Sequence, residues 1–302
     1  PGRTVRIPER SVFAMIIRPA THNDIEPSID LLHTKMSRKI SPERWRRIFE
    51  YDWGMAKPDY GYVAEVDGRI VGYVGAVHAD RVIDGRRVAM TNMCAWYLEK
   101  ENRGHGAGQR LMAQATSDPS RHYTSMTSTS NPRTMGVLRS AGFAPLDEYR
   151  WDWQRNTQGT QGIQAILNVD DILARSTGQE RACLNDLLPY GIMPVLLRQD
   201  DREFLIVFAD TVKGDDQPWL DVLYMRGAET GFLADFGQQV ANLLLPADNA
   251  VLSIDRRFCG KDPGSGTRIT LPAPRFVKSP DLSGSGVDHL YTELQLLSLK
   301  LD

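Results

Sequence analysis

The sequence predicts an α/β fold in which a mixed β-sheet carries helices on both faces, with the chain organised as two units. Short apolar runs of strand length alternate with helix-length amphipathic segments along most of the chain. The length of 302 residues suggests two domains, at about 150 residues per domain. Because 41% of the residues are hydrophobic and 25% are charged, a wholly disordered or fibrous protein is excluded.

The first unit is expected to begin with a strand and two helices. Residues 15–20 form an apolar run that is typical of a strand. Thr21 or Asn23 can cap a helix that extends to about Lys35. A second helix is expected to begin at Ser41-Pro42, because Ser is a good N-cap residue and Pro fits the first helical turn.

Three strands are then expected to form an antiparallel meander. The apolar runs at 60–66, 70–79 and 88–98 are separated by Asp67-Gly68 and Asp84-Gly85. Asp-Gly pairs favour the positive φ angles that tight hairpin turns require. The three strands are therefore expected to be neighbours in the sheet.

A glycine-rich turn leads from the meander to the rest of the first unit. We expect a helix over 106–116, a Thr- and Ser-rich strand over 123–128, a helix after Asn131-Pro132 and a last strand over 143–153. The resulting order is strand, two helices, three-strand meander, helix, strand, helix, strand. Such an order builds a mixed sheet with helices on both faces.

Composition marks the boundary between the two units. Residues 156–162 are polar, rich in glycine and without apolar anchors, as expected of a linker or an exposed loop. We therefore expect a first domain over 15–155 and a C-terminal α+β domain over 156–302. Residues 1–14 are treated as an N-terminal extension, because their apolar patch is too short for a secretory signal. In the second domain the patterns predict a helix and six strands, at 229–245 and at 192–198, 203–211, 219–225, 250–255, 267–271 and 290–299.

The sharpest local feature is the glycine-rich turn that follows the strand ending at Leu98. It contains Arg103, Gly104, Gly106 and Gly108, and an amphipathic helix begins within it. Glycine lets backbone N–H groups approach a phosphate closely, and a helix N-terminus adds partial positive charge. The spacing is neither that of a Walker loop nor that of a dinucleotide fingerprint. The turn is therefore a candidate anion cradle, and a ligand-free turn remains the alternative.

Two motifs resemble the signatures of the GNAT superfamily of N-acetyltransferases. Arg103-x-x-Gly106-x-Gly108 resembles the family's acyl-CoA pyrophosphate motif, and Asn131 followed by Gly142-Phe143 resembles its second signature. The resemblance covers about residues 15–153. It implies a V-shaped gap between the strand that ends at Leu98 and the strand over 123–128, with acetyl-CoA or another acyl-CoA as the cofactor.

The resemblance also implies how the cofactor is held. The turn and the helix that follows it would bind the pyrophosphate, and the strand before the turn would offer its backbone to the pantetheine arm. The cofactor-binding residues carried over in this way are Cys94, Trp96, Leu98, Arg103, Gly104, His105, Gly106, Ala107, Gly108, Gln109, Asn131 and Arg133.

The sequence departs from the family pattern where proton transfer is expected. Many members have a tyrosine five residues before the Phe of the second signature, and this chain has Leu138 there. Some members have a glutamate on the strand before the turn, but no carboxylate occurs over 88–98. The candidate replacements are His78, Asn92, Ser130 and Tyr123, each of which also has an ordinary structural interpretation. Aminolysis of a thioester can also proceed largely by positioning of the reactants.

The remaining composition restricts the partners. Cys94, Cys183 and Cys259 are too few and too scattered for a disulfide framework or a zinc site, which indicates a reducing, cytoplasmic location without a metal. No apolar run approaches the roughly 20 residues of a membrane helix. The formal net charge of −2 gives no basic excess for nucleic acid. Neither a membrane nor a nucleic acid is therefore an expected partner, and the oligomeric state is left open, with a dimer as one option.

The second unit contains a possible counterpart of the turn. Arg226 to Gly231 follows a strand and begins a helix, as Arg103 to Gly108 does, but Glu229 stands where the first turn has Gly106. We hypothesise a degenerate GNAT-like unit that does not bind CoA, because a carboxylate repels a pyrophosphate. The alternative is an unrelated α+β domain.

The resemblance implies an acyl-CoA-dependent N-acyltransferase, in which an amine attacks the thioester directly. The acceptor would be a small molecule or a peptide, and the sequence does not identify it. A catalytically silent acyl-CoA-binding regulator or scaffold is the alternative, supported by the missing tyrosine and glutamate.

Overall fold

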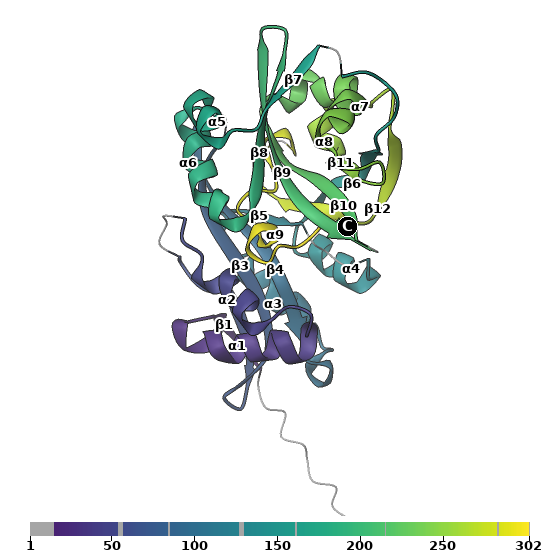
Figure 1. The fold of residues 1–302 in the computed structure, drawn as a ribbon. Helices are drawn as coiled ribbons and strands as arrows, with labels where there is room; N and C mark the ends of the chain where they lie inside the picture. Colours follow the sequence, from purple (N-terminus) through teal and green to yellow (C-terminus); the bar gives the residue numbers. More distant parts are fainter. Residues whose placement is uncertain are drawn as a thin grey trace, which may run out of the picture.

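The described strands of the protein form one continuous sheet that joins two lobes (Figure 1). The structure is a computed structural model. It describes residues 15–53, 57–83, 85–126, 130–160, 162–214, 216–282 and 284–301. Residues 1–14, the hairpin position Asp84 and residues 127–129 lie outside the described residues, and 127 and 128 are the last two positions of the predicted Thr- and Ser-rich strand.

The first half of the chain follows the predicted order of elements. Its members are β1 (Ile16–Pro19), α1 (Ile25–Leu31), α2 (Pro42–Glu50), β2 (Tyr62–Val66), β3 (Arg69–Ile83), β4 (Arg86–Leu98), α3 (Ala107–Ala115), β5 (His122–Ser125), α4 (Pro132–Ser140) and β6 (Ala144–Trp153). Short 3-10 turns precede α1 and lie between β4 and α3, and a π-helical turn over Leu32–Met36 extends α1. The prediction of one helix to about Lys35 is thus confirmed in position, with irregular ends.

The second half continues the sheet with six further strands. Its members are β7 (Ile163–Ile166), α5 (Val169–Arg175), α6 (Gly178–Leu187), β8 (Ile192–Gln199), β9 (Arg202–Lys213), β10 (Gln217–Met225), α7 (Phe232–Leu244), β11 (Val251–Asp255), α8 (Arg256–Cys259), β12 (Thr267–Lys278) and α9 (Glu293–Leu296). No sequence pattern predicted β7, α5, α6 or α8.

Local sequence signals explain several element boundaries. The Ser41 hydroxyl accepts a hydrogen bond from the Arg44 amide, and Pro42 occupies the first position of α2. Asp67 and Gly68 have φ angles of 52° and 75°, as the tight turn between β2 and β3 requires. These features confirm the predicted helix start and the first hairpin.

The order of strands in the sheet is β1-β2-β3-β4-β5-β12-β6-β11-β10-β9-β8-β7. From one edge of the sheet inward, the strands follow chain order from β1 to β5. From the other edge inward, they follow chain order from β7 to β11. In both series the fourth strand from the edge is parallel to the fifth, namely β4 to β5 and β10 to β11. The sixth strands are exchanged, because β12 pairs with β5 and β6 pairs with β11. The two halves therefore interlock at the centre of one sheet.

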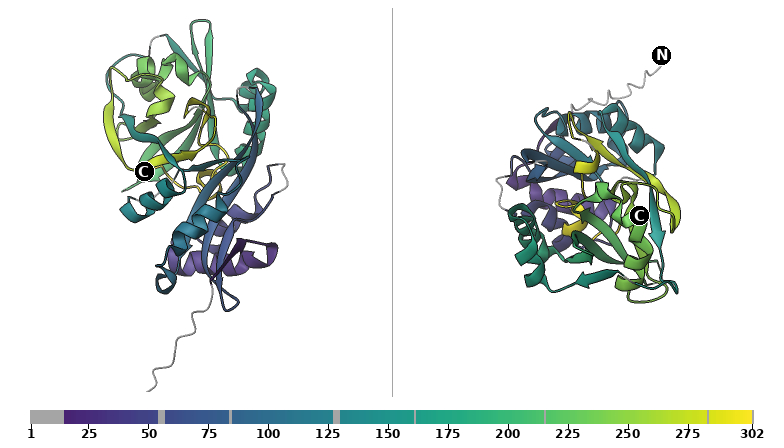
Figure 2. Two further views of the ribbon diagram at one scale, coloured as in Figure 1. Left: turned by 180° about the vertical axis from the view of Figure 1, so that it is seen from behind. Right: turned by 90° about the horizontal axis from the view of Figure 1, so that it is seen from above.

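The helices of the first half cover opposite faces of its sheet. Buried side chains of α1 and α2 share one core with α6, β8 and the C-terminal segment over 287–301, whereas α3 and α4 share another core on the other face. Figure 2, seen from behind, shows α3 and α4 on the side away from α1. In Figure 1 the yellow α9 lies between the two lobes, on the face that carries α1 and α2.

The predicted strand over 290–299 is wrong, because this segment contains the short helix α9. Its leucines resemble an alternating pattern, yet Thr292 and Gln295 form a capping box that begins a helical turn. Glu293 and Gln295, which a half-buried strand would expose, are both buried. The capping hydrogen bonds and the burial of polar side chains decide the local structure here.

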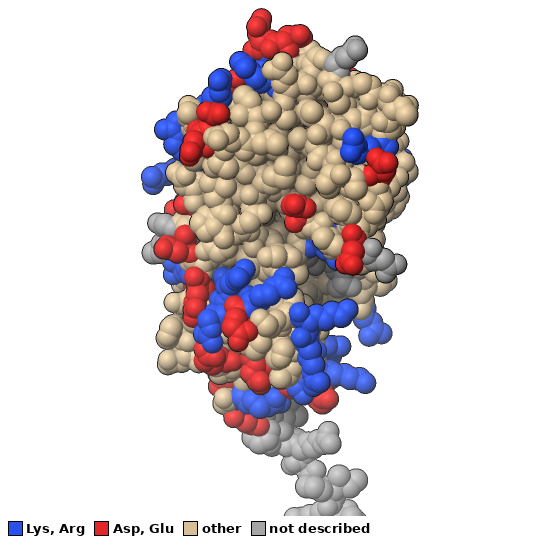
Figure 3. Space-filling model, viewed as in Figure 1, with Lys and Arg blue, Asp and Glu red and all other residues tan. Residues whose placement is uncertain are grey.

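Charged side chains are distributed unevenly over the face of the molecule seen in Figure 3. Figure 3 shows blue and red side chains interspersed over the lower lobe, whereas the upper lobe on this face is largely uncharged. No helix in the described part of the chain is long and apolar enough to span a membrane.

Candidate functional site

The glycine-rich turn of the first half lies between the end of β4 and the start of α3. Gly104, His105 and Gly106 have φ angles of 121°, 45° and 71°, so three consecutive residues have positive φ. A Cβ atom placed on Gly104 would have no described atom within 4 Å. The space in front of the turn is therefore open, and the backbone there can accept a close ligand.

Arg103 is held at the entrance of this turn. Its Nε donates a hydrogen bond of 2.8 Å to the carbonyl oxygen of Leu98, and its guanidinium lies 5.4 Å from the centre of the Tyr97 ring. Gly108 lies in the first turn of α3, where a Cβ atom would be 3.2 Å from the Trp96 ring. The glycine thus lets Trp96 pack on the helix, and the turn carries one formal positive charge beside the N-terminus of α3.

Next to the turn, β4 and β5 separate. Their last paired residues are Asn92 and Thr124, and β4 continues to Leu98 beyond this pair. The register between β3 and β4 shifts near Ala95, whose φ is 47°. A bulge with a left-handed residue twists a strand locally and turns it away from its partner. Beyond Asn92, β4 therefore has no described partner strand on its β5 side. This separation of the two strands, which the sequence led us to expect, is called the gap below.

The point where the two strands part carries a buried polar cluster. The Asn92 side-chain amide donates a hydrogen bond to the carboxylate of Glu293, and its oxygen accepts one of 3.0 Å from the Thr124 hydroxyl. Asn92 is 3% exposed and Glu293 is 1% exposed. Of the three predicted catalytic residues, Asn92 is thus the one that the structure places at the gap.

Glu293, which lies about 200 residues further along the chain, was not among the predicted site residues. The signal available in the sequence was a single acidic residue within the largely apolar run over 290–299. Buried carboxylates are uncommon unless they are paired or functional, so this residue merited attention.

His78 lies away from this cluster. Its ring nitrogens hydrogen-bond to the Thr91 hydroxyl at 3.0 Å and to the Asp59 carboxylate at 3.1 Å. Thr91 and Asn92 are consecutive on β4, so their side chains point to opposite faces of the sheet. His78 therefore occupies the other face from Asn92 and Glu293.

The contacts of Ser130, Tyr123 and the position of the missing tyrosine are those of ordinary structural residues. Ser130 is exposed just before Asn131, whose side chain caps α4 by accepting a hydrogen bond from the Arg133 amide. Leu138, at the family's tyrosine position, is 1% exposed in the core between α3 and α4. Burial raises the pKa of Tyr123 to about 12, and its hydroxyl donates to a backbone carbonyl.

Cys94 lies beside the gap but is poorly suited to be a nucleophile. It is buried and unpaired. Burial, and after it the negative charge of Glu293, raise the pKa of the Cys94 thiol well above its usual range. Since the thiolate is the reactive form, Cys94 packs here as a small apolar side chain.

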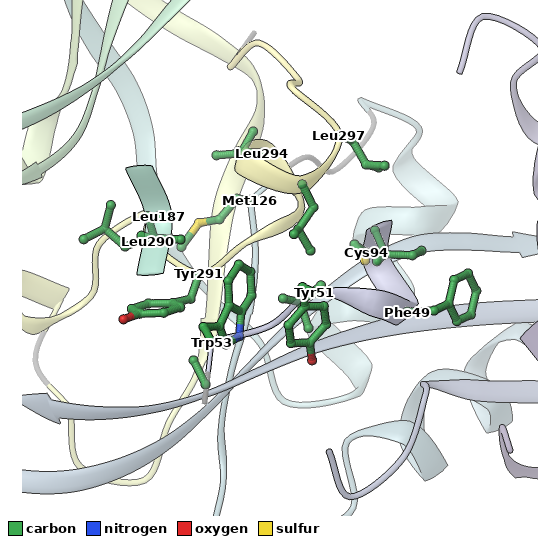
Figure 4. Packing of buried hydrophobic residues seen from close by; sticks show 14 of the residues in the cluster. Phe49, Tyr51, Trp53, Cys94, Met126, Leu187, Leu290, Tyr291, Leu294 and Leu297 are labelled. Carbon is green, nitrogen blue, oxygen red and sulfur yellow. The ribbon is translucent and has the colours of Figure 1, made fainter. Parts of the chain in front are cut away.

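The C-terminal segment packs into the core of the first half on one side of the gap. Figure 4 shows Tyr291 beside Trp53, with Cys94 and Met126 in the same cluster. The Trp53 and Tyr291 rings meet edge to face, with their centres 5.1 Å apart. Arg44 of α2 donates to the carbonyl of Leu297. The second half of the chain thus contributes directly to the surroundings of the first-half gap.

The corresponding turn of the second half is filled by the chain itself. Gly227 and Gly231 have φ angles of 73° and 75° and precede α7. A Cβ atom on Gly260, just after α8, would lie 2.5 Å from the Ala228 carbonyl oxygen and 3.0 Å from the Gly231 amide nitrogen. The backbone that follows α8 therefore packs directly on this turn.

The charged residues of this second turn also differ from those of the first. Arg226 forms two hydrogen bonds with the Glu180 carboxylate, at 2.7 Å and 2.6 Å. Glu229 is exposed. The gap between β10 and β11 is also occupied, because the His289 amide donates a hydrogen bond of 2.9 Å to the Leu223 carbonyl of β10.

A buried charged cluster fixes the segments that fill the second half. Arg257 of α8 bonds to Asp147 of β6 and lies 3.3 Å from Asp255, which also contacts Arg275 and the His289 ring. Burial opposes ionisation of Asp255, but Arg275 and His289 hold its pKa well below its usual range. Burial, and then the charge of Arg257, lower the pKa of His289 to about 4.

The described residues contain no group of three or more His, Cys, Asp or Glu side chains that could hold a metal ion. The features that remain as a candidate site are the open turn, the gap beside β4 and the polar cluster at its apex.

Comparison with known proteins identifies the family signature of the first half. Residues 27–143 match the family model described as Acetyltransferase (GNAT) family. No protein with a curated description matches this sequence.

Solved structures resemble nearly the whole chain. A GCN5-related N-acetyltransferase from Anabaena variabilis matches with a TM-score of 0.53 and 14% identity, over 87% of this chain and 72% of its own. One from Kribbella flavida matches with a TM-score of 0.51 and 10% identity, over 88% and 70%. The GCN5-related glucosamine N-acetyltransferase region of a fungal multi-domain GH3 β-N-acetylglucosaminidase matches with a TM-score of 0.55 and 13% identity, over 88% and 38%. At these identities the likeness concerns the fold, and it confirms the predicted α/β class.

Proposed function

We propose an activity from one premise, which is that residues 27–143 of this chain match the GNAT acetyltransferase family model. The family transfers acyl groups from acyl-CoA to amines in general. For this chain we propose an N-acyltransferase, with acetyl-CoA as the simplest donor and a small-molecule or peptide amine as the acceptor.

The observation that carries this proposal is the open turn beside the gap of β4 and β5. Arg103, the backbone of 104–108 and the N-terminus of α3 would hold the pyrophosphate. The backbone of β4 from Cys94 to Leu98 would pair with the pantetheine arm as an added strand does. The thioester would then reach the neighbourhood of Asn92.

The chemistry proposed is direct attack of the acceptor nitrogen on the thioester carbonyl. The carbon–nitrogen bond forms, the carbon–sulfur bond breaks, and CoA leaves as the thiol after it takes a proton. The burial of the Cys94 thiol and its raised pKa support a route without an acyl-enzyme. Alignment of the reactants can supply much of the rate enhancement.

For the second half we propose a degenerate copy of the same unit. Two observations support this proposal. The strand order of the first half is repeated in the second, and β10, α7 and β11 form a strand–turn–helix–strand succession. The proposed domains are 15–155 and 156–302, with β6 and β12 exchanged between them. Because its own turn and gap are filled, we assign this half a supporting role.

A reducing, cytoplasmic location is part of the proposal. It rests on Cys94, Cys183 and Cys259, which are all buried and unpaired.

The test is a thiol-release assay with acetyl-CoA and a panel of tyramine, spermidine and a lysine-containing peptide. At least one amine is expected to give amine-dependent release, and CoA is expected to raise the melting temperature by mass action. Saturable CoA binding without release for any amine would favour the silent regulator. Absence of CoA binding would overturn the proposal altogether.

A further inference from the structure

Glu293 is a carboxylate that the last segment of the chain brings to the apex of the gap. Its partner Asn92 belongs to the last paired residues of β4 and β5. Beyond this pair the two strands part, and the proposed thioester would arrive there. The carboxylate is therefore placed at the proposed reaction centre by a segment far away in the sequence.

The side of the sheet on which Glu293 lies is defined by its neighbours. Met93 is buried in the core that contains α3, so Asn92 and Cys94 point to the opposite face. Glu293 reaches this face and influences the pKa of Cys94. The core on this face also contains the buried edge-to-face pair of Trp53 and Tyr291.

The position also answers a question that the sequence of the first half leaves open. No carboxylate occurs over 88–98, although a general base is useful at this point. Glu293 is 1% exposed, and its carboxylate accepts a hydrogen bond from the Asn92 amide. A carboxylate held at this point of the gap can supply the missing base.

We propose that Glu293 is the catalytic base that removes the proton from the acceptor, and that the acceptor is an amine that is cationic at neutral pH. This inference rests on the proposed function. The Glu293 carboxylate takes one proton from the ammonium group, and the neutral nitrogen then attacks the thioester carbon. After the carbon–sulfur bond breaks, the thiolate takes one of the two protons that left the nitrogen, and the other is released to solvent.

Burial makes this proton transfer easier than it is in water. In water a carboxylic acid and an alkylammonium differ by about 6 pKa units, so the ammonium keeps its proton. In a dry site the charged pair loses hydration, and the neutral pair of carboxylic acid and amine becomes comparatively more favourable. The Asn92 amide holds one oxygen of the carboxylate by a hydrogen bond at the end of the β4–β5 pairing.

The test compares Glu293→Gln with the wild type, using the panel amine that gives the fastest thiol release. The variant is expected to lose about 100- to 10,000-fold in kcat, with an unchanged KM for acetyl-CoA and unchanged CoA-dependent stabilisation. Hydroxylamine, which is largely unprotonated at neutral pH, is expected to lose far less rate, because it needs no base to become a nucleophile. A kcat for the alkylamine within about threefold of the wild type would overturn the proposal.

Two further variants separate chemistry from folding. Asp288→Asn changes another buried carboxylate of the same segment, which pairs with Arg81. It is expected to lower the melting temperature while leaving kcat nearly unchanged. A kcat loss in Asp288→Asn equal to that in Glu293→Gln would mean that loosening of the segment is the cause, and would overturn the proposal.

If Glu293→Gln does not fold, Glu293→Asp tests the role of the carboxylate instead. Withdrawing the carboxylate by one methylene is expected to cost about tenfold or more in kcat, with the KM for acetyl-CoA unchanged. An undiminished kcat would overturn the proposal. A wild type that binds CoA but acylates no amine would instead overturn the proposed function, together with this inference.

Discussion

The two halves of the molecule contain the same strand–turn–helix arrangement, one open and one filled. In the first half, the turn after β4 has space in front of Gly104, and β4 extends past its pairing with β5. In the second half, the backbone at Gly260 packs on the turn after β10, and the His289 amide bonds to the Leu223 carbonyl. Both turns keep glycines with positive φ angles.

The comparison shows that two turns of similar sequence can differ in whether their backbone is open to a ligand. Glycines and a helix N-terminus are present twice, but the N–H groups are available to a ligand only where no other segment covers them. The second half uses its turn as a packing surface. The same C-terminal segment that fills the second gap also carries Glu293 to the first.

The largest effect is expected from Asp147→Asn, which removes the partner that holds α8 over the second turn. Arg257 would lose its closest carboxylate in a buried site. We expect the free energy of unfolding to fall by about 3–5 kcal/mol, the usual cost of breaking a buried ion pair. Urea unfolding measures this change.

The control for this variant is Arg86→Ala, which breaks an exposed ion pair with Asp281. Exposed pairs contribute at most about 1 kcal/mol, so this change should hardly move the urea midpoint. Equal losses in the two variants would show that the buried cluster does not hold the filled half together.

The next effect is expected from Gly106→Glu in the open turn. The substituted residue would have to adopt a φ of 71°, and its carboxylate would face the phosphates. We expect the Kd for CoA to rise by at least about 100-fold, equivalent to about 2.7 kcal/mol. Isothermal titration calorimetry measures this directly.

Gly178→Glu provides the matched control for the open turn. Gly178 is exposed in the first turn of α6, and a Cβ atom there would meet no described atom within 4 Å. The new carboxylate is compatible with a helix N-terminus, so CoA binding should be unchanged. If Gly106→Glu also binds CoA as tightly as the wild type, the turn is not the phosphate site.

Features that depend on residues close together in the sequence were predictable, and features that depend on contacts between distant segments were not. The hairpin at Asp67-Gly68, the cap at Ser41 and the turn at 103–108 were predictable, because each depends on neighbouring residues. The exchange of β6 and β12 was not, because strand pairing is decided by contacts between distant segments. The position of Glu293 was not predictable for the same reason, since its partner Asn92 lies about 200 residues earlier.

A smaller effect is expected from lowering the pH, which weakens the segment that fills the second gap. The pKa of His289 is lowered to about 4, below the ordinary value of about 6.5. Above pH 6.5 the ring is neutral in both states, and between pH 6.5 and 4 the unfolded state binds the proton more readily. Stability should therefore fall across this window, by about 1–2 kcal/mol after relaxation of the site.

Comparison with His289→Gln isolates this contribution. Burial also lowers the pKa of His122, which contributes in the same direction in both proteins. We expect the variant to show a flatter loss of unfolding free energy between pH 6.5 and 4, measured by urea unfolding. Parallel curves for the two proteins would contradict a role for His289 protonation.

The smallest effect is expected from Glu229→Gly, which gives the second turn a glycine at the position where the first turn has Gly106. If the carboxylate alone prevented binding, this change would create a second CoA site. Glu229 is exposed, however, and the turn is covered by the backbone at Gly260 whichever side chain stands at this position. Calorimetry should therefore still give one CoA per chain with an unchanged Kd. A second binding event would show that charge, and not the packed chain, distinguishes the two halves.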